Sequence, residues 1–295
     1  MTVPRRWWLA TTGVVLFSII AFGVAQATGV SLLPAHTPGS KAVPLAVVSR
    51  TGPMAGLRVE ILAATSVDDL RSLAFAAGGP NENTCVRLPE CWSSITLARP
   101  SLLIALSTPA PCRKSVLSAD LGPGAHLTVH VVVGGWECPG GAGALTAPIY
   151  WLLAVPLEGL PPTVLTVAVD SKLSVLMIGP HGGQPLYSVA SSTTVDLRPP
   201  LPKQADGVPS TAELRSAVQQ AQRNAESRPG NSPRLIDLAL RRWPRSDLGC
   251  GSSGNETDLV WGSLIVFRAD TPTNAAAYEY HELAGRTVFC RDRIP

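Results

Sequence analysis

Charged and aromatic side chains are scarce in this chain of 295 residues. Asp, Glu, Lys and Arg together make up 15% of it, and Phe, Trp and Tyr make up 5%. The net charge of +3 is small and dispersed, which excludes the basic stripe that nucleic-acid binding requires. With 27 prolines and 26 glycines, the composition favours turn-rich β structure, with a core built from Val, Leu, Ile and Ala rather than aromatic residues.

Charge is completely absent from Trp7 to Ser40, directly behind Arg5 and Arg6. A positive flank followed by a long apolar run is the signal that export machinery recognises. We therefore expect the protein to be extracytoplasmic, either secreted or anchored to the cell membrane by one N-terminal helix.

Two outcomes for this export segment stay open. The apolar run Trp7–Ala27 has the length of a membrane-spanning helix, which needs about 20 residues, and this favours a retained anchor. The sequence Ala25-Gln26-Ala27 is a small-x-small cleavage site, and this favours a signal peptide. Residues 1–27 are thus predicted to be a signal peptide or a signal anchor.

All six cysteines follow the export segment, and thiols oxidise outside the cytosol, so we expect disulfide bonds. Six cysteines allow 15 pairings, which the sequence alone does not distinguish. The domain partition favours a bridge between the two cysteines beyond the proline-rich linker, and proximity favours two further bridges. The predicted pairs are Cys250 with Cys290, Cys85 with Cys91, and Cys112 with Cys138.

The predicted fold class is mainly β, with an antiparallel β-sandwich-like domain followed by a small, disulfide-stapled α+β domain. The boundary is placed at Arg198–Pro202, where three prolines interrupt any ladder or helix. The predicted parts are an irregular stalk at 28–56, the sandwich-like domain at 57–197, the linker at 198–209 and the α+β domain at 210–295.

Two helices are predicted from capping patterns, one opening at Ser66 and one running from Ser210 to about Ala225. Strands follow from alternating or continuous apolar runs, most clearly in His126–Val133. The segment 235–242 fits both a strand and a short helix. The other predicted strands are Arg58–Leu62, Leu102–Ser107, Ile149–Val155, Thr163–Val169, Leu173–Ile178, Leu259–Arg268, Ala276–Leu283 and Thr287–Cys290.

Glu279 and His281 are the strongest candidates for chemistry. On a strand they share one face, about 7 Å apart, near enough for one ligand or a proton relay. The simpler interpretation, which we favour, is that Tyr278 and Tyr280 face the core while the polar pair faces water. No other pattern has the spacing of a catalytic, phosphate-binding or zinc site, so we expect no catalytic residues, cofactor or metal.

The first half of the chain resembles the exported protease-complex-stability subunit family. The resemblance rests on the strand patterns of Leu102–Leu106, His126–Val133 and Thr163–Val169, and on the Pro-aromatic turn at Pro148-Ile149-Tyr150. It implies a β-rich exported protein without catalytic machinery that assists a partner protease complex.

The C-terminal part resembles an uncharacterised, disulfide-stapled domain of bacterial envelope proteins. The matching residues are Trp243-Pro244, Leu248-Gly249-Cys250, Tyr278-Glu279-Tyr280-His281 and Val288-Phe289-Cys290, although this chain has Gly251 where the domain ordinarily has proline. The resemblance implies the Cys250–Cys290 bridge and no activity.

These observations predict a non-enzymatic envelope protein that binds another extracytoplasmic protein, in the form of a module that assists or restrains a secreted protease. The alternatives are an envelope hydrolase using Glu279 and His281, or a structural or glycan-binding envelope component.

Overall fold

The computed structural model describes residues 39–50, 57–79, 95–109, 114–134, 148–174, 185–202, 206–245, 247–250, 258–270 and 275–293. The predicted export segment and the cysteines at 85, 91, 112 and 138 lie outside these ranges. No helix in the described ranges is both long enough and apolar enough to cross a membrane.

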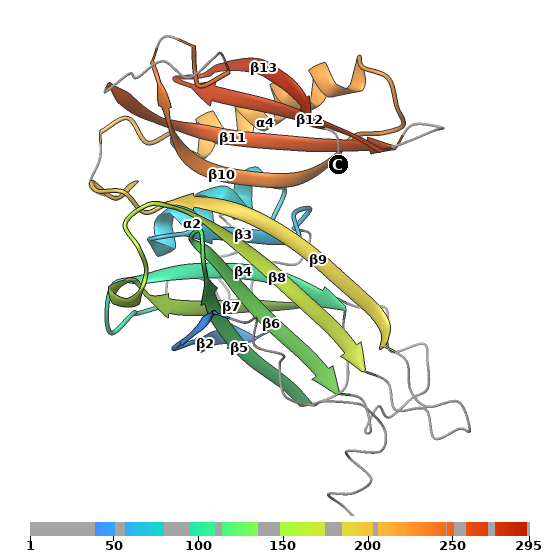
Figure 1. Cartoon of the computed structure of the whole chain (residues 1–295). Helices are drawn as coiled ribbons and strands as arrows, with labels where there is room; N and C mark the ends of the chain where they lie inside the picture. Colours follow the sequence, from blue (N-terminus) through green and yellow to red (C-terminus); the bar gives the residue numbers. More distant parts are fainter. Residues whose placement is uncertain are drawn as a thin grey trace, which may run out of the picture.

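The described chain is mostly β, as predicted, and its strands form three sheets (Figure 1). The elements in chain order are β1 (Lys41–Val43), β2 (Ala46–Arg50), β3 (Ile61–Ala64), α2 (Val67–Ala76), β4 (Ser101–Pro109), β5 (Lys114–Gly122), β6 (His126–Gly134), β7 (Pro148–Pro156), the 3-10 turn η3 (Leu157–Gly159), β8 (Val164–Ser174), β9 (Pro185–Asp196), α4 (Thr211–Glu226), β10 (Arg234–Pro244), β11 (Leu259–Asp270), β12 (Ala275–Leu283) and β13 (Arg286–Arg293).

Two of the sheets pack face to face as a sandwich. One has the strand order β1-β5-β6-β8-β9 and the other the order β2-β7-β4-β3. Their facing residues alternate along each strand and are fully buried, for example Leu127, Val129 and Val131 of β6 against Leu102 and Ile104 of β4. This period of two is what a strand with one core-facing side requires.

A second core joins the sandwich to the C-terminal sheet, which has the order β10-β11-β12-β13. Helices α2 and α4 contact each other, and both contribute buried residues to this core. Its buried residues include Leu62 and Leu103 from the sandwich and Phe267 and Tyr280 from the C-terminal sheet. The two predicted domains therefore share apolar packing across the predicted linker.

Both helix starts match the sequence predictions. The side chain of Ser66 accepts a hydrogen bond from the backbone N–H of Asp69 at the start of α2. At α4, Ser210 and Glu213 form the full reciprocal capping box. Such local signals are carried by four consecutive residues, so the sequence alone specifies them.

The segment 235–242, predicted as either a strand or a short helix, is a strand: it lies within β10 and forms a ladder with β11. The other strand predictions differ from the structure in three ways. Strand β8 runs without a break from Val164 to Ser174, so it joins the strand predicted at 163–169 to the first two residues of the one predicted at 173–178, whose remaining residues lie outside the described ranges. Strands β1, β2, β5 and β9 were not predicted, and β6 and β8 pair in parallel rather than antiparallel.

The proline-rich segment is held against both neighbouring sheets by Asp196. This buried carboxylate at the end of β9 accepts hydrogen bonds from the guanidinium groups of Arg198 and Arg242. Arg242 of β10 also donates to the carbonyl oxygens of Arg198 and Pro199. A second link joins the same two strands, since Thr193 donates to Asp237 at 2.8 Å.

We expect the Asp196 cluster to make stability sensitive to acid. Burial alone would raise the pKa of Asp196, but hydrogen bonds from Arg198 and Arg242 outweigh it and lower the pKa from 3.8 to about 2. Because the folded pKa lies below the unfolded value, the contribution is complete above about pH 4 and is lost as the pH falls through 2. Since Arg198 is 37% exposed, we expect a loss of only about 1–2 kcal/mol.

The measurement is urea unfolding at pH 5, 3 and 2 for the wild type and for Asp196→Asn. The variant cannot ionise, so its free energy of unfolding should fall less steeply with acid than that of the wild type. Parallel pH profiles for the two proteins would contradict the prediction.

Candidate functional site

Strand β12 has both of its faces buried, which corrects the interpretation that the Glu279 and His281 pair faces water. Tyr278 and Tyr280 face α4 and the shared core, as expected. Glu279 and His281 lie on the opposite face, yet each is only 2% exposed. The sequence prediction that they share a face is confirmed, but the environment of that face is different.

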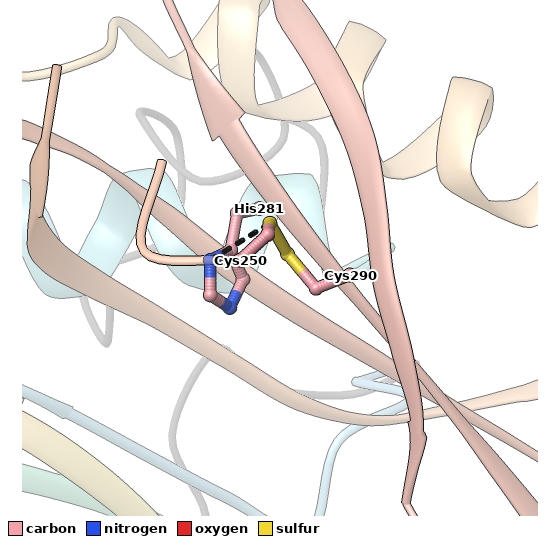
Figure 2. Close-up of side chains that lie close together, drawn as sticks. All are labelled: Cys250, His281 and Cys290. Carbon is pink, nitrogen blue, oxygen red and sulfur yellow. Dashed lines mark hydrogen bonds between the residues drawn. A yellow bond between two sulfur atoms is a disulfide. The ribbon is translucent and has the colours of Figure 1, made fainter. Parts of the chain in front are cut away.

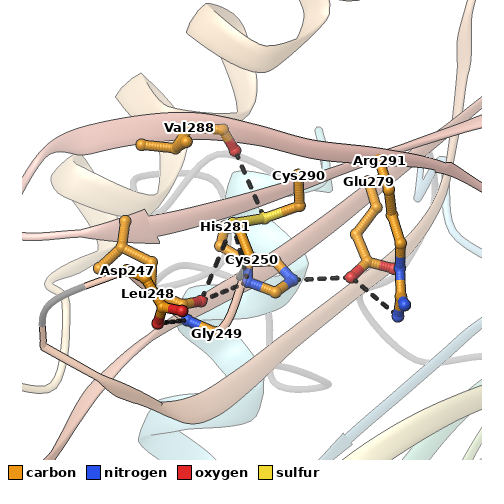
Figure 3. Close-up of a disulfide and its surroundings, with 9 residues drawn as sticks. All are labelled: Asp247, Leu248, Gly249, Cys250, Glu279, His281, Val288, Cys290 and Arg291. Atoms are coloured by element: carbon orange, nitrogen blue, oxygen red, sulfur yellow. Dashed lines mark hydrogen bonds and ion pairs between the residues drawn. A yellow bond between two sulfur atoms is a disulfide. The ribbon is translucent and has the colours of Figure 1, made fainter. Parts of the chain in front are cut away.

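The Cys250–Cys290 disulfide, which is present as predicted, helps to cover this outer face (Figure 3). It ties the turn at 247–250 to the edge strand β13, with 4.8 Å between the two Cα atoms. The turn is tightened by the Gly249 N–H, which donates to the Asp247 carboxylate at 2.8 Å. The bridge thus fixes Leu248, whose carbonyl oxygen points at His281.

Both ring nitrogens of His281 are engaged. Nδ1 lies 2.6 Å from the carbonyl oxygen of Leu248, and Nε2 lies 2.8 Å from Oε1 of Glu279. A carbonyl oxygen only accepts, so Nδ1 carries a proton and donates it to Leu248. A second proton lies between Nε2 and Glu279, so the two side chains together form a net neutral, proton-sharing pair.

Three further groups support this pair. The guanidinium of Arg291, which is 66% exposed, lies 3.4 Å from the Glu279 carboxylate. The ring of Trp243 stacks on the His281 ring with 3.7 Å between centroids and 14° between planes. Gly262 provides the space, because a Cβ there would meet the backbone oxygen of Glu282 at 2.0 Å and the Trp243 ring at 2.9 Å.

The outcome is a cluster in which a half-buried disulfide lies beside a buried imidazole and a buried carboxylate. The donor atoms of Cys250, His281 and Cys290 all lie within 4.8 Å of one another, and Cys250 Sγ is 3.6 Å from His281 Nδ1 (Figure 2). Because the imidazole and the carboxylate satisfy each other and are screened from solvent, their immediate role is to hold the turn at 247–250 on the sheet.

A separate cavity of about 500 Å³ lies where α2, α4 and β10 meet. Three arginines from distant parts of the sequence line it: Arg58, Arg215 and Arg234. No carboxylate is among its lining residues in the described ranges, although Arg234 lies 3.8 Å from the nearby Glu60. The apolar part of the lining is contributed mainly by Phe75, Ala76, Ala77, Val218, Pro233, Leu235 and Phe267.

Sequence reasoning found part of these two sites. Trp243 and Leu248 were named only among the residues that carry the resemblance of the C-terminal part. Arg291 was not identified from the sequence. The three pocket arginines were also missed, since they are separated in sequence and only the tertiary fold brings them together. Trp151, unassigned from the sequence, is buried in the sandwich and donates to Thr108 at 3.0 Å.

Comparisons of the chain with family models, with curated proteins and with solved structures found no match. The two family resemblances stated above therefore stay predictions from the sequence.

Proposed function

We propose that the protein is a non-enzymatic, extracytoplasmic module that binds another extracytoplasmic protein. The observation that carries this proposal is the arginine-lined cavity between α2, α4 and β10. Its lining combines three arginines with apolar side chains, and this combination suits an acidic segment that carries an apolar side chain. The Cys250–Cys290 bridge is consistent with an oxidising compartment.

The more specific form of this proposal is that the partner is a secreted protease complex, which the module assists or restrains. Its support is the resemblance of the first half of the chain to a family of non-catalytic protease-complex subunits. The hydrolase alternative draws no support from the burial of Glu279 and His281, because a substrate in solution cannot contact side chains that are 2% exposed.

The test is a pull-down from the native envelope under non-reducing conditions, with three baits. These are the wild type, the double variant Arg58→Glu/Arg215→Glu, and Arg286→Glu as a control for charge reversal at an exposed arginine in the β12–β13 hairpin. We expect the double variant to bind the partner at least about tenfold more weakly than the wild type, and the control to bind normally. Proteolytic activity of the captured material tests the more specific form.

Equal recovery of the partner by the wild type and the double variant would overturn the role of the cavity. If no bait retained any protein at low salt, where charge complementarity acts most strongly, the proposal of a protein-binding module would itself be wrong.

A further inference from the structure

We propose that Cys250, Cys290 and His281 form a zinc site when the disulfide between the two cysteines is reduced. Zinc prefers four ligands in tetrahedral geometry, and thiolate sulfur and imidazole nitrogen are its usual protein donors. With Zn–S of about 2.3 Å and Zn–N of about 2.0–2.1 Å, a sulfur and a nitrogen on one zinc ion lie roughly 3.6 Å apart. The observed distance from Cys250 Sγ to His281 Nδ1 is 3.6 Å (Figure 2).

The surroundings of His281 match those of a metal-bound histidine. Such a histidine usually donates its second ring N–H to a carboxylate, which fixes the tautomer and the ring orientation. Glu279 occupies that position, 2.8 Å from Nε2, and Arg291 lies on its other side. The stacked Trp243 ring fixes the imidazole plane. Nδ1, the ring nitrogen that lies 3.6 Å from Cys250 Sγ, is therefore the one available to a metal ion.

A fourth donor is also present. The carbonyl oxygen of Leu248 lies 2.6 Å from His281 Nδ1 and 4.0 Å from Cys250 Sγ. In the oxidised protein this oxygen accepts a hydrogen bond from Nδ1–H, and in the zinc form it becomes an oxygen ligand. The distance between this oxygen and Nδ1 then has to widen to roughly 3.4 Å, and the two sulfurs have to separate to roughly 3.8 Å. Both are movements of the short turn at 247–250 relative to β12 and β13.

The reaction needs a reductant, for which a dithiol serves. Two electrons and two protons pass to Cys250 and Cys290, their S–S bond breaks, and the dithiol closes to a cyclic disulfide. Zn²⁺ then binds two thiolates and one neutral imidazole, and the two thiol protons and the Nδ1 proton pass to water. The same three side chains thus hold the turn through a covalent bond when oxidised and through a metal ion when reduced.

Co²⁺ is the probe, because cobalt bound by thiolates in tetrahedral geometry absorbs visible light. The full chain is reduced with dithiothreitol, desalted without oxygen and titrated with CoCl₂. We expect one equivalent to bind with a thiolate-to-cobalt charge-transfer band and to be displaced by Zn²⁺, whereas the oxidised protein gives no such band. The variant Cys250→Ser/Cys290→Ser, which keeps the other four cysteines, should lack it. Glu279→Gln should weaken binding about 10–100-fold.

Three results would overturn the proposal: no cobalt band after reduction, the same band in the double serine variant, or the same band in the oxidised protein. If reduction unfolds the protein, Zn²⁺ has to restore the near-ultraviolet circular dichroism of the wild type but not of the double serine variant, and failure to do so would equally reject the site.

Discussion

Replacing Glu279 with alanine is expected to lower the free energy of unfolding by about 3–5 kcal/mol, the range seen when one partner of a buried ion pair is removed. The variant leaves Nε2 of His281 without its acceptor in a position screened from water. It also removes the carboxylate that forms an ion pair with the guanidinium of Arg291. The measurement is urea unfolding, where the midpoint should fall without a change in slope.

Two further variants make the Glu279 result specific. Glu158→Ala changes an exposed glutamate in η3 and should stay within about 0.5 kcal/mol of the wild type. Glu279→Gln keeps the shape and one accepting oxygen, so its loss should be smaller than that of alanine. A Glu279→Ala protein as stable as the Glu158→Ala control would show that the pair does not support the fold.

The second large loss of stability is expected when the Cys250–Cys290 disulfide is removed. The cysteines are separated by 40 positions, and the chain-entropy relation gives about 4 kcal/mol for closing a loop of that length. We expect Cys250→Ser/Cys290→Ser to lose about this amount, a large part of a domain stability of about 5–15 kcal/mol. The measurement is again the free energy of unfolding in urea, under non-reducing conditions that leave the other cysteines unchanged.

Serine keeps the size of the side chain, so the loss reports the cross-link rather than a cavity. A change below about 1 kcal/mol would mean that the hydrogen bonds of His281 hold the turn without the bridge. Because Cys250 contacts His281, losses from the two sets of variants should not add when they are combined.

The sequence predicted the features of this fold that depend on neighbouring residues. The helix caps at Ser66 and Ser210 and the alternation of β6 are local, and they were confirmed, although the full reciprocal capping box is present only at Ser210. Strand β9 was missed because much of its sequence is serine and threonine, so its pairing with β8, rather than an apolar run, places it in the sheet. The parallel pairing of β6 with β8 depends on the path of the whole chain, which no local pattern reports.

The candidate site shows the same limit. The alternation of aromatic and polar residues along the strand predicted correctly that Glu279 and His281 share a face. It did not predict that the Cys250–Cys290 disulfide holds the turn at 247–250 over that face. The expectation of no metal rested on local cysteine spacing and stays a prediction, whereas the zinc proposal rests on Cys250, His281 and Cys290, which lie on a turn and two strands. Contacts between distant segments decide the chemistry here.

The cavity at α2, α4 and β10 has a thermodynamic consequence. Its lining residues come from the chain before and after the proline-rich segment. The cavity therefore exists only while the sandwich and the C-terminal sheet are packed together. By linkage, an occupant that binds only the docked state stabilises the entire chain, by about 2.7 kcal/mol at a concentration one hundred times its dissociation constant. A rise in melting temperature on adding a candidate partner would therefore report occupancy without any label.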